Sequence, residues 1–206
     1  ALRRRPGPPP VSLPTPYYED DAVTIYHGDC LDIIDLLTFD LVVTDPPYGI
    51  GLDTDYSRLR GTPDFNKNYG SYHGGRHNLV VGDDEPFDPT WLLAWPAALF
   101  GVNHYASRVP DGWTWHIWDK RDGLASNMLA DAEIWATSWQ SGPTRIFRYK
   151  WLGYMRPRGA ETTFDHPTAK PLALMRYIIG EERTPAGVIL DPFMGSGTTL
   201  RAAKDL

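Results

Sequence analysis

The chain has 206 residues, 42% of them hydrophobic, which is enough for one globular domain with a buried core. Its one cysteine, Cys30, excludes a disulfide framework and is typical of a reducing, cytoplasmic location. No apolar stretch reaches the length of a membrane span, and a formal net charge of −6 argues against a protein that coats nucleic acid non-specifically.

The first part of the chain predicts an arm followed by a β-α-β unit. Prolines interrupt residues 1–16 every few positions, so we expect an extended arm, and a single domain over 17–206. A strand over 23–26 and a short helix over about 31–37 then lead to the next strand, which we expect to lie parallel to the first. Asp29 would lie near the end of that second strand, or it would act only as the N-cap of the helix.

The second strand, 39–44, is apolar and β-branched, and it ends at the sequence Asp-Pro-Pro-Tyr. Each proline fixes its own φ and restricts the residue before it, so Asp45 and Tyr48 are held on a stiff backbone. They follow the carboxyl end of a strand, where open α/β sheets place their ligands. A carboxylate, two proline carbonyls and an aromatic ring form a receptor for a flat molecule with an amino group. The alternative is a rigid turn with a capping Asp and a core Tyr.

The segment 49–79 is polar and rich in glycine, and it is too long for an ordinary connection, so it predicts a loop or lid at the active site. Basic and aromatic residues alternate in it, as suits a nucleic-acid strand. The candidate DNA-binding residues there are Arg58, Arg60 and Arg76. His73 and His77 are four residues apart, but no helix would aim both at one metal, and we predict no metal site.

The middle of the chain predicts a helix over 89–98 and strands over 98–102 and 113–118. Two further strands, 132–139 and 144–151, read as an antiparallel pair. Residues 140–160 contain five basic side chains and no acid. We therefore expect a hairpin over 132–160 that contacts DNA phosphates through Arg145, Arg148 and Lys150, the alternative being a solvated surface.

The C-terminal part predicts a cofactor site. Thr168 and Lys170 flank the start of a helix over about 172–182, where a carboxylate or phosphate would bind. A strand over 187–190 then leads into the glycine-containing segment 191–199, and a helix begins at about Thr198. A strand, a Gly-x-Gly turn and a helix N-terminus form a close-approach site for a nucleotide-like cofactor. A P-loop lysine and the third glycine of a dinucleotide fingerprint are both missing.

Together these blocks resemble the S-adenosylmethionine-dependent DNA amino-methyltransferases, which methylate adenine N6 or cytosine N4. Residues 45–48 match the family's catalytic motif, 191–199 its cofactor loop, and 166–171 the segment that precedes this loop. The order of the motifs resembles the permuted β group, and the similarity runs from about residue 23 to residue 206. The resemblance implies an α/β, Rossmann-like methyltransferase fold with a mixed, mostly parallel sheet and helices on both faces.

The resemblance also implies roles for individual residues. The catalytic set would be Asp45, Pro46, Pro47 and Tyr48, with Asp45 and the Pro46 carbonyl accepting hydrogen bonds from the amine of a flipped-out base and Tyr48 stacking on it. Thr168 and Lys170 would hold the methionine end of the cofactor, while Asp29 and Cys30 would lie against its adenosine. The full set assigned to S-adenosylmethionine is Asp29, Cys30, Asp45, Thr168, Lys170, Asp191, Phe193, Gly195, Ser196, Gly197, Thr198 and Thr199.

In the family that this chain resembles, aspartate at the first position of the catalytic motif favours adenine over cytosine, so the resemblance implies adenine N6 in double-stranded DNA as the target. The alternatives are a cytosine-N4 enzyme, a methyltransferase that acts on protein or RNA, and a non-catalytic DNA-binding relic. The relic is considered because the sequence stops at Asp205-Leu206, before the strand whose acidic residue grips the ribose in the family. A homodimer is left open.

Overall fold

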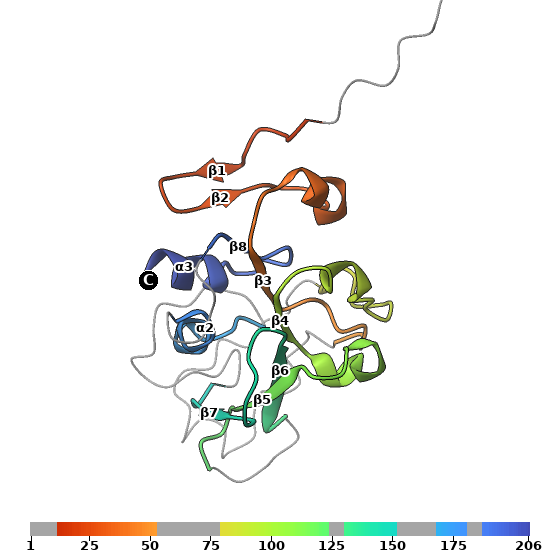
Figure 1. The fold of residues 1–206 in the computed structure, drawn as a ribbon, viewed down its shortest axis with the longest axis vertical. Coiled ribbons are helices and arrows are strands. Elements are labelled where there is room, and N and C mark those ends of the chain that lie inside the picture. Colours follow the sequence, from red (N-terminus) through yellow and green to blue (C-terminus); the bar gives the residue numbers. More distant parts are fainter. Residues whose placement is uncertain (1–11, 53–78, 124–129, 152–167, 181–186) are drawn as a thin grey trace, which may run out of the picture. The chain divides into compact units, whose positions relative to one another are not determined.

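The computed structural model describes residues 12–52, 79–123, 130–151, 168–180 and 187–206 (Figure 1). The chain divides into two compact units, one up to Thr38 and one from Phe39 onward. Of the predicted arm over 1–16, residues 12–16 are described, and they form no helix or strand. Within the described ranges, no helix is both long enough and apolar enough to span a bilayer.

The N-terminal unit contains a two-stranded antiparallel sheet of β1 (Tyr18–Glu19) and β2 (Thr24–Ile25). The predicted parallel β-α-β unit is therefore wrong, because β2 pairs with β1 and not with the strand before Asp45. The turn explains the difference. The Asp20 carboxylate accepts hydrogen bonds from the amides of Ala22 and Val23, both at 2.9 Å, and so closes a tight hairpin.

The predicted helix over 31–37 is replaced by two 3₁₀ turns, η1 (Cys30–Asp32) and η2 (Ile34–Leu36). Asp29 caps the first turn, since its Oδ1 accepts a hydrogen bond of 2.9 Å from the Leu31 amide. Residues 32–35, Asp-Ile-Ile-Asp, span the junction of the two turns, and both residue types have a lower helix propensity than alanine or leucine, which favours short turns over one continuous helix.

The C-terminal unit is built on a six-stranded sheet with the order β7-β5-β6-β4-β3-β8. Neighbouring strands run parallel except where β6 pairs with β4 and with β5, so β6 is the one antiparallel strand of this sheet. This arrangement confirms the predicted mixed, mostly parallel sheet of an α/β fold. The strand bounds are β3 Leu41–Thr44, β4 Ala97–Phe100, β5 Thr114–Asp119, β6 Ala132–Thr137, β7 Ile146–Arg148 and β8 Ile189–Leu190.

Two predicted elements of this unit differ in the structure. The helix expected over 89–98 is only a 3₁₀ turn, η4 (Thr90–Leu92), and β4 begins directly after Pro96. The Pro96 carbonyl accepts a hydrogen bond of 2.9 Å from the Val42 amide, so this proline already takes part in the pairing of β4 with β3. Beyond β4 follow two more 3₁₀ turns, η5 (Val102–His104) and η6 (Ala106–Arg108).

The hairpin predicted over 132–160 is also corrected. β6 and β7 do not pair with each other, because β5 lies between them: β5 is antiparallel to β6 and parallel to β7. The apolar alternation identified both strands but carried no information about their partners. Residues 152–160 of that segment lie outside the described ranges.

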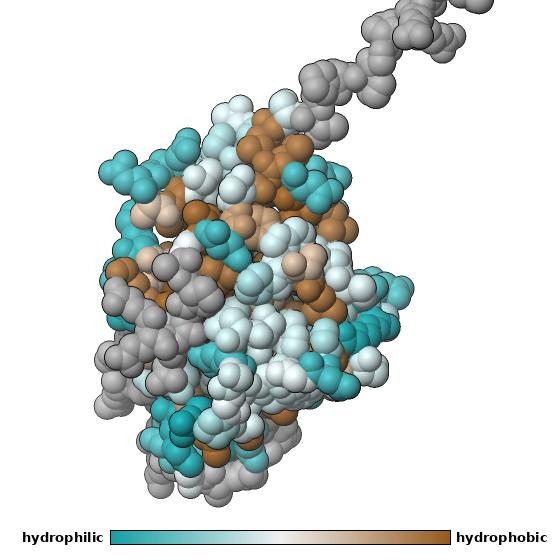
Figure 2. All heavy atoms as spheres, in the orientation of Figure 1, coloured by the Kyte–Doolittle hydropathy of each residue, from teal (hydrophilic) through white to brown (hydrophobic). Residues whose placement is uncertain are grey.

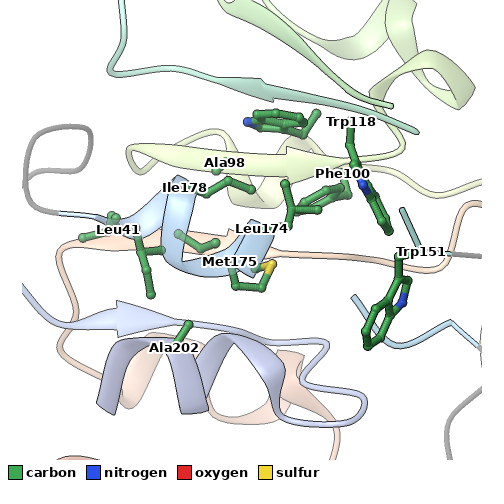
Figure 3. Close-up of a cluster of buried hydrophobic side chains, with 12 residues drawn as sticks. Leu41, Ala98, Phe100, Trp118, Trp151, Leu174, Met175, Ile178 and Ala202 are labelled. Atoms are coloured by element: carbon green, nitrogen blue, oxygen red, sulfur yellow. The ribbon is translucent and has the colours of Figure 1, made fainter. Parts of the chain in front are cut away.

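The helices α2 (Leu172–Ile179) and α3 (Thr198–Lys204) pack on one face of the sheet (Figure 3). Leu174, Met175 and Ile178 of α2 meet sheet residues such as Leu41 and Phe100 there. Every residue of β3 and β4 is fully buried, so the other face of these strands is covered as well. In Figure 2 apolar residues still reach the surface among polar ones; exposed examples are Ile50, Leu79 and Val81.

Candidate active site

The two motifs that are most distant in the sequence meet at one edge of the sheet. β3 ends at Thr44 and β8 at Leu190, and the two strands are parallel neighbours. The Thr44 hydroxyl donates a hydrogen bond of 2.6 Å to Oδ1 of Asp191, the first residue after β8. The turn that begins at Asp45 and the glycine-containing segment from Asp191 to Thr199 (the glycine loop) therefore lie side by side, as the sequence predicts for the carboxyl ends of parallel strands.

Both carboxylate oxygens of Asp45 have partners. Oδ1 accepts a hydrogen bond of 2.5 Å from the Tyr48 hydroxyl, and Oδ2 accepts one from the Lys170 ammonium. Each carboxylate oxygen has two lone pairs, so Asp45 retains acceptor capacity for a further N–H donor. The Asp45 carboxylate is thus oriented from two sides and can still receive an amino group.

Lys170 connects the turn at Asp45 to the rest of the sheet. The segment before α2 is fixed by the Trp151 indole, which donates a hydrogen bond of 2.8 Å to the Ala169 carbonyl. The Lys170 side chain is 8% exposed, and its Nζ lies 3.2 Å from Oε2 of Glu133 in addition to its bond with Asp45. Burial by itself would lower the pKa of Lys170, but the two carboxylates raise it, so this ammonium stays charged.

Glu133, on β6, is a part of this network that the sequence pattern did not reveal. Its Oε1 lies 2.6 Å from Nζ of Lys120, and its Oε2 faces Lys170. Burial by itself would raise the pKa of Glu133, but the two ammonium groups bring it down to about 2. A short acid–base series results: Asp45, Lys170, Glu133 and Lys120.

Replacing Glu133 with Gln should lower the free energy of unfolding at pH 7 by about 2–3 kcal/mol. The folded pKa of about 2 is below the usual value of 4.5, so the stability due to Glu133 is fully present above about pH 5. It is lost as the pH falls towards 2, and the two proteins should then converge. Denaturant titrations at several pH values measure this; the exposed Glu19→Gln serves as the control, and a pH-independent difference would contradict the account.

The ring of Tyr48 is packed tightly. It stacks on His104 with a centroid distance of 5.0 Å and an interplanar angle of 15°. On Gly101 a Cβ would lie only 2.1–2.5 Å from atoms of the Tyr48 ring, and this glycine has a φ of +68°. The backbone at Gly101 can therefore approach the ring only because it carries no side chain. Burial and the Asp45 carboxylate raise the pKa of Tyr48, which keeps its hydroxyl protonated as a donor.

The glycine loop begins at Asp191, a carboxyl group with a raised pKa. Burial raises the pKa of Asp191 to about 6, although the hydroxyls of Thr199 and Thr44 donate to it. Gly195 and Gly197 have φ values of +52° and +76°, which glycine adopts without strain. A Cβ on Gly197 would meet no atom within 4 Å, so the space beside this backbone is open.

The aromatic member of the glycine loop, Phe193, is held from outside the loop. Its ring makes edge-type contacts with Phe87 at 5.6 Å and Trp91 at 6.1 Å between centroids. Its amide donates a hydrogen bond of 3.2 Å to Asp191. Ser196 and Thr198 share a hydrogen bond of 3.0 Å between their hydroxyls at the start of α3. The loop is therefore formed and supported by neighbouring segments.

Several predicted site residues stay predictions. Asp29 and Cys30 belong to the N-terminal unit, and Arg58, Arg60 and Arg76 lie outside the described residues, as do His73 and His77. Arg145 directly precedes β7 and Arg148 is its last residue, and both are exposed. The Nε atom of Arg148 lies 3.8 Å from Oδ2 of Asp119. Arg145, Arg148 and Lys150 remain candidate phosphate contacts on the outer strand of the sheet.

Comparison with known proteins gives a consistent result. A family model described as DNA methylase, N6_N4_Mtase, matches residues 111–206. Type II methyltransferase M.ScaI of Streptomyces caespitosus is 26% identical over 94% of this chain and 77% of its own length. Type II methyltransferase M2.MboI of Moraxella bovis is 24% identical over 89% of this chain and 80% of its own. The crystal structure of an M1.HpyAVI–SAM complex aligns over 87% of each chain, with 24% identity and a TM-score of 0.45.

Proposed function

We propose, on the premise that residues 111–206 belong to the N6/N4 family of DNA methylases, that this protein transfers a methyl group from S-adenosylmethionine to adenine N6 in double-stranded DNA. The observation that supports this most is the hydrogen bond between Thr44 and Asp191, which joins the turn at Asp45 to the glycine loop. A carboxylate acceptor and an open, glycine-lined approach then lie at one sheet edge. Both relatives compared are Type II methyltransferases, so a restriction–modification role in the cytoplasm is the expected setting.

The residues at this edge fit the methionine end of the cofactor, which carries one ammonium and one carboxylate group. Asp191 is a partly buried acid that accepts hydrogen bonds from the Thr44 hydroxyl and the Phe193 amide, so an ammonium beside it would be favourable. Lys170 donates a hydrogen bond to Asp45 and forms an ion pair with Glu133, and since an ammonium has three N–H groups it can still donate to a further acceptor. When bound, the cofactor supplies the methyl group as an electrophile on sulfonium.

Asp45 has the main chemical role in this proposal. Its free lone pairs accept a hydrogen bond from the exocyclic amine, which directs the nitrogen lone pair and increases its electron density. S-adenosylmethionine would supply the methyl group to this nitrogen and leave as the neutral thioether, and Asp45 would accept the proton that the amine loses and pass it on to water. Rate enhancement comes from positioning and from fixed charges, not from a covalent enzyme intermediate.

Tyr48 would supply the stacking surface for a base taken out of the duplex, a contact worth about 1–3 kcal/mol. His104 now covers one face of the ring and is itself exposed. We infer that the target base takes the place of His104 on this face. The imidazole thus occupies the position of a flat ring until DNA arrives.

The affinity for a cofactor analogue should depend on Asp191 and on pH. With a pKa of about 6, the ionised fraction of Asp191 falls from about nine-tenths at pH 7 to about one-tenth at pH 5. If the carboxylate holds the ammonium group, the affinity for sinefungin should fall about tenfold over this range. Calorimetry at both pH values measures it. Asp191→Asn should bind weakly with no such dependence; a wild-type affinity that does not change with pH would contradict this role.

Nucleoside analysis tests the function and its main alternative. The protein is incubated with S-adenosylmethionine and unmodified genomic DNA, which is then digested and examined by mass spectrometry. We expect N6-methyladenine. N4-methylcytosine instead would show the cytosine-N4 alternative, and cofactor binding without methylation of any DNA would exclude DNA as the substrate. No cofactor binding at all would support the non-catalytic relic.

A further inference from the structure

The turn that follows Pro47 is organised by a carboxylate from a distant part of the sequence. Asp83 is 5% exposed, and its side chain accepts hydrogen bonds from four backbone amides. Oδ1 receives the amides of Tyr48 at 2.9 Å, Gly49 at 2.8 Å and Ile50 at 3.3 Å. Oδ2 receives the amide of Leu52 at 2.7 Å.

The backbone around Asp83 adds further contacts to the same turn. The Asp83 carbonyl accepts a hydrogen bond of 2.8 Å from the Gly51 amide. Gly49 lies so close to the residues after Asp83 that a Cβ on it would be 2.4 Å from the Glu85 carbonyl oxygen. The backbone N–H of every residue from Tyr48 to Leu52 therefore donates a hydrogen bond to Asp83.

These amides have no helix or strand to bond with. Pro46 and Pro47 carry no N–H, the turn reverses through Gly49 and Gly51 at φ values of +72° and +58°, and β3 has already ended at Thr44. The Asp83 carboxylate that four of these amides reach is buried, and a charged acceptor is the strongest partner available for backbone donors that point inward. The turn thus holds its shape through Asp83.

We propose that Asp83 is a positioning residue for methyl transfer: by fixing the amides of residues 48–52, it sets where the Tyr48 ring and the Asp45 carboxylate lie. The link to chemistry is direct, because the Tyr48 amide is bonded to Asp83 while the Tyr48 hydroxyl is bonded to Asp45. This role rests on the proposed function, since it concerns the same turn. Its effect should appear in the transfer step and not in cofactor binding at the glycine loop.

Two substitutions and one control test this role. Asp83→Ala removes all four acceptor contacts, whereas Asp83→Asn keeps one acceptor oxygen and turns the other into a donor that faces an amide. Asp84→Asn is the control: it removes a charge from the exposed residue next to Asp83, and this variant should behave as wild type. We expect kcat to fall about 10²-fold in Asp83→Ala and about tenfold in Asp83→Asn, with the affinity for sinefungin unchanged.

Hydrogen exchange gives a readout that does not require activity. The amides of residues 48–52 should exchange at least about tenfold faster in both Asp83 variants, and those of β3 should not change. A general folding defect would instead accelerate β3 and weaken sinefungin binding, and would overturn a specific positioning role. Unchanged exchange at 48–52 would overturn the role whatever the activity, whereas a wild-type protein that methylates no DNA would contradict the proposed function.

Discussion

Replacing Gly101 with Ala should both destabilise the protein and impair methyl transfer. The added Cβ would lie 2.1–2.5 Å from the Tyr48 ring, and alanine would also have to adopt a φ of +68°. The backbone conformation costs about 1–2 kcal/mol. Forcing the ring aside costs about 1–3 kcal/mol more. We therefore expect a loss of about 2–5 kcal/mol in the free energy of unfolding, measured by denaturant titration.

The functional part of this prediction follows from where the ring would go. A displacement of about 1 Å at a reacting group can cost about 10²-fold in rate, and Tyr48 also holds the Asp45 carboxylate. Gly112→Ala is a matched control, because it imposes a similar φ of +88° while its Cβ would meet no atom within 4 Å. The free energy of unfolding of Gly112→Ala should fall only by the cost of the backbone conformation, about 1–2 kcal/mol, and its methyl-transfer activity should be unchanged. Equal effects of the two substitutions would show that Tyr48 does not depend on contact with Gly101.

Replacing Asp45 with Ala should reduce kcat by about 10³-fold, at the upper end of what a single fixed hydrogen-bonding group contributes. The variant removes the proposed acceptor for the target amine and also releases the Tyr48 hydroxyl and the Lys170 ammonium. The fold should persist, because Lys170 retains Glu133 as a partner. Steady-state kinetics and calorimetry with sinefungin separate the two effects: kcat should fall about 10³-fold, and the affinity for sinefungin should fall much less, because the glycine loop and Lys170 remain.

Asp45→Asn refines this test. An amide oxygen can still accept one hydrogen bond, but the charge that attracts Lys170 is gone and one oxygen becomes a donor. We expect a rate between those of the wild type and of Asp45→Ala. A rate of Asp45→Ala close to wild type, with normal cofactor binding, would show that another group activates the amine.

The meeting of the two motifs could be predicted from the sequence because it depends on local features. Each apolar run ends in a distinctive turn, at Asp45 and at Asp191, and parallel strands place such turns at one edge. The structure shows the two turns joined through Thr44. The residues of each turn are contiguous in the sequence, so their spacing carried the information.

The residues that support the turns could not be found in this way. Asp83 is 35 residues from Tyr48, and Glu133 reaches Lys170 from the antiparallel strand β6. A single acid in a polar stretch has no periodic signal, and pairing partners of strands are set by the whole sheet. The error at β2 has a different cause: its partner is decided by the local turn at Asp20, which the apolar pattern of the strand does not describe.

The most direct test of the central claim is a pulse–chase of the methyl group in a single turnover. The protein is loaded with methyl-labelled S-adenosylmethionine, then mixed with unmodified genomic duplex DNA and an excess of unlabelled cofactor, and label on DNA is counted. If the glycine loop and the turn at Asp45 form one site, wild type should transfer its label to adenine, and Asp45→Ala should retain labelled cofactor without transferring it. Equal transfer by both proteins, or loaded wild type that passes no label to DNA, would contradict the account.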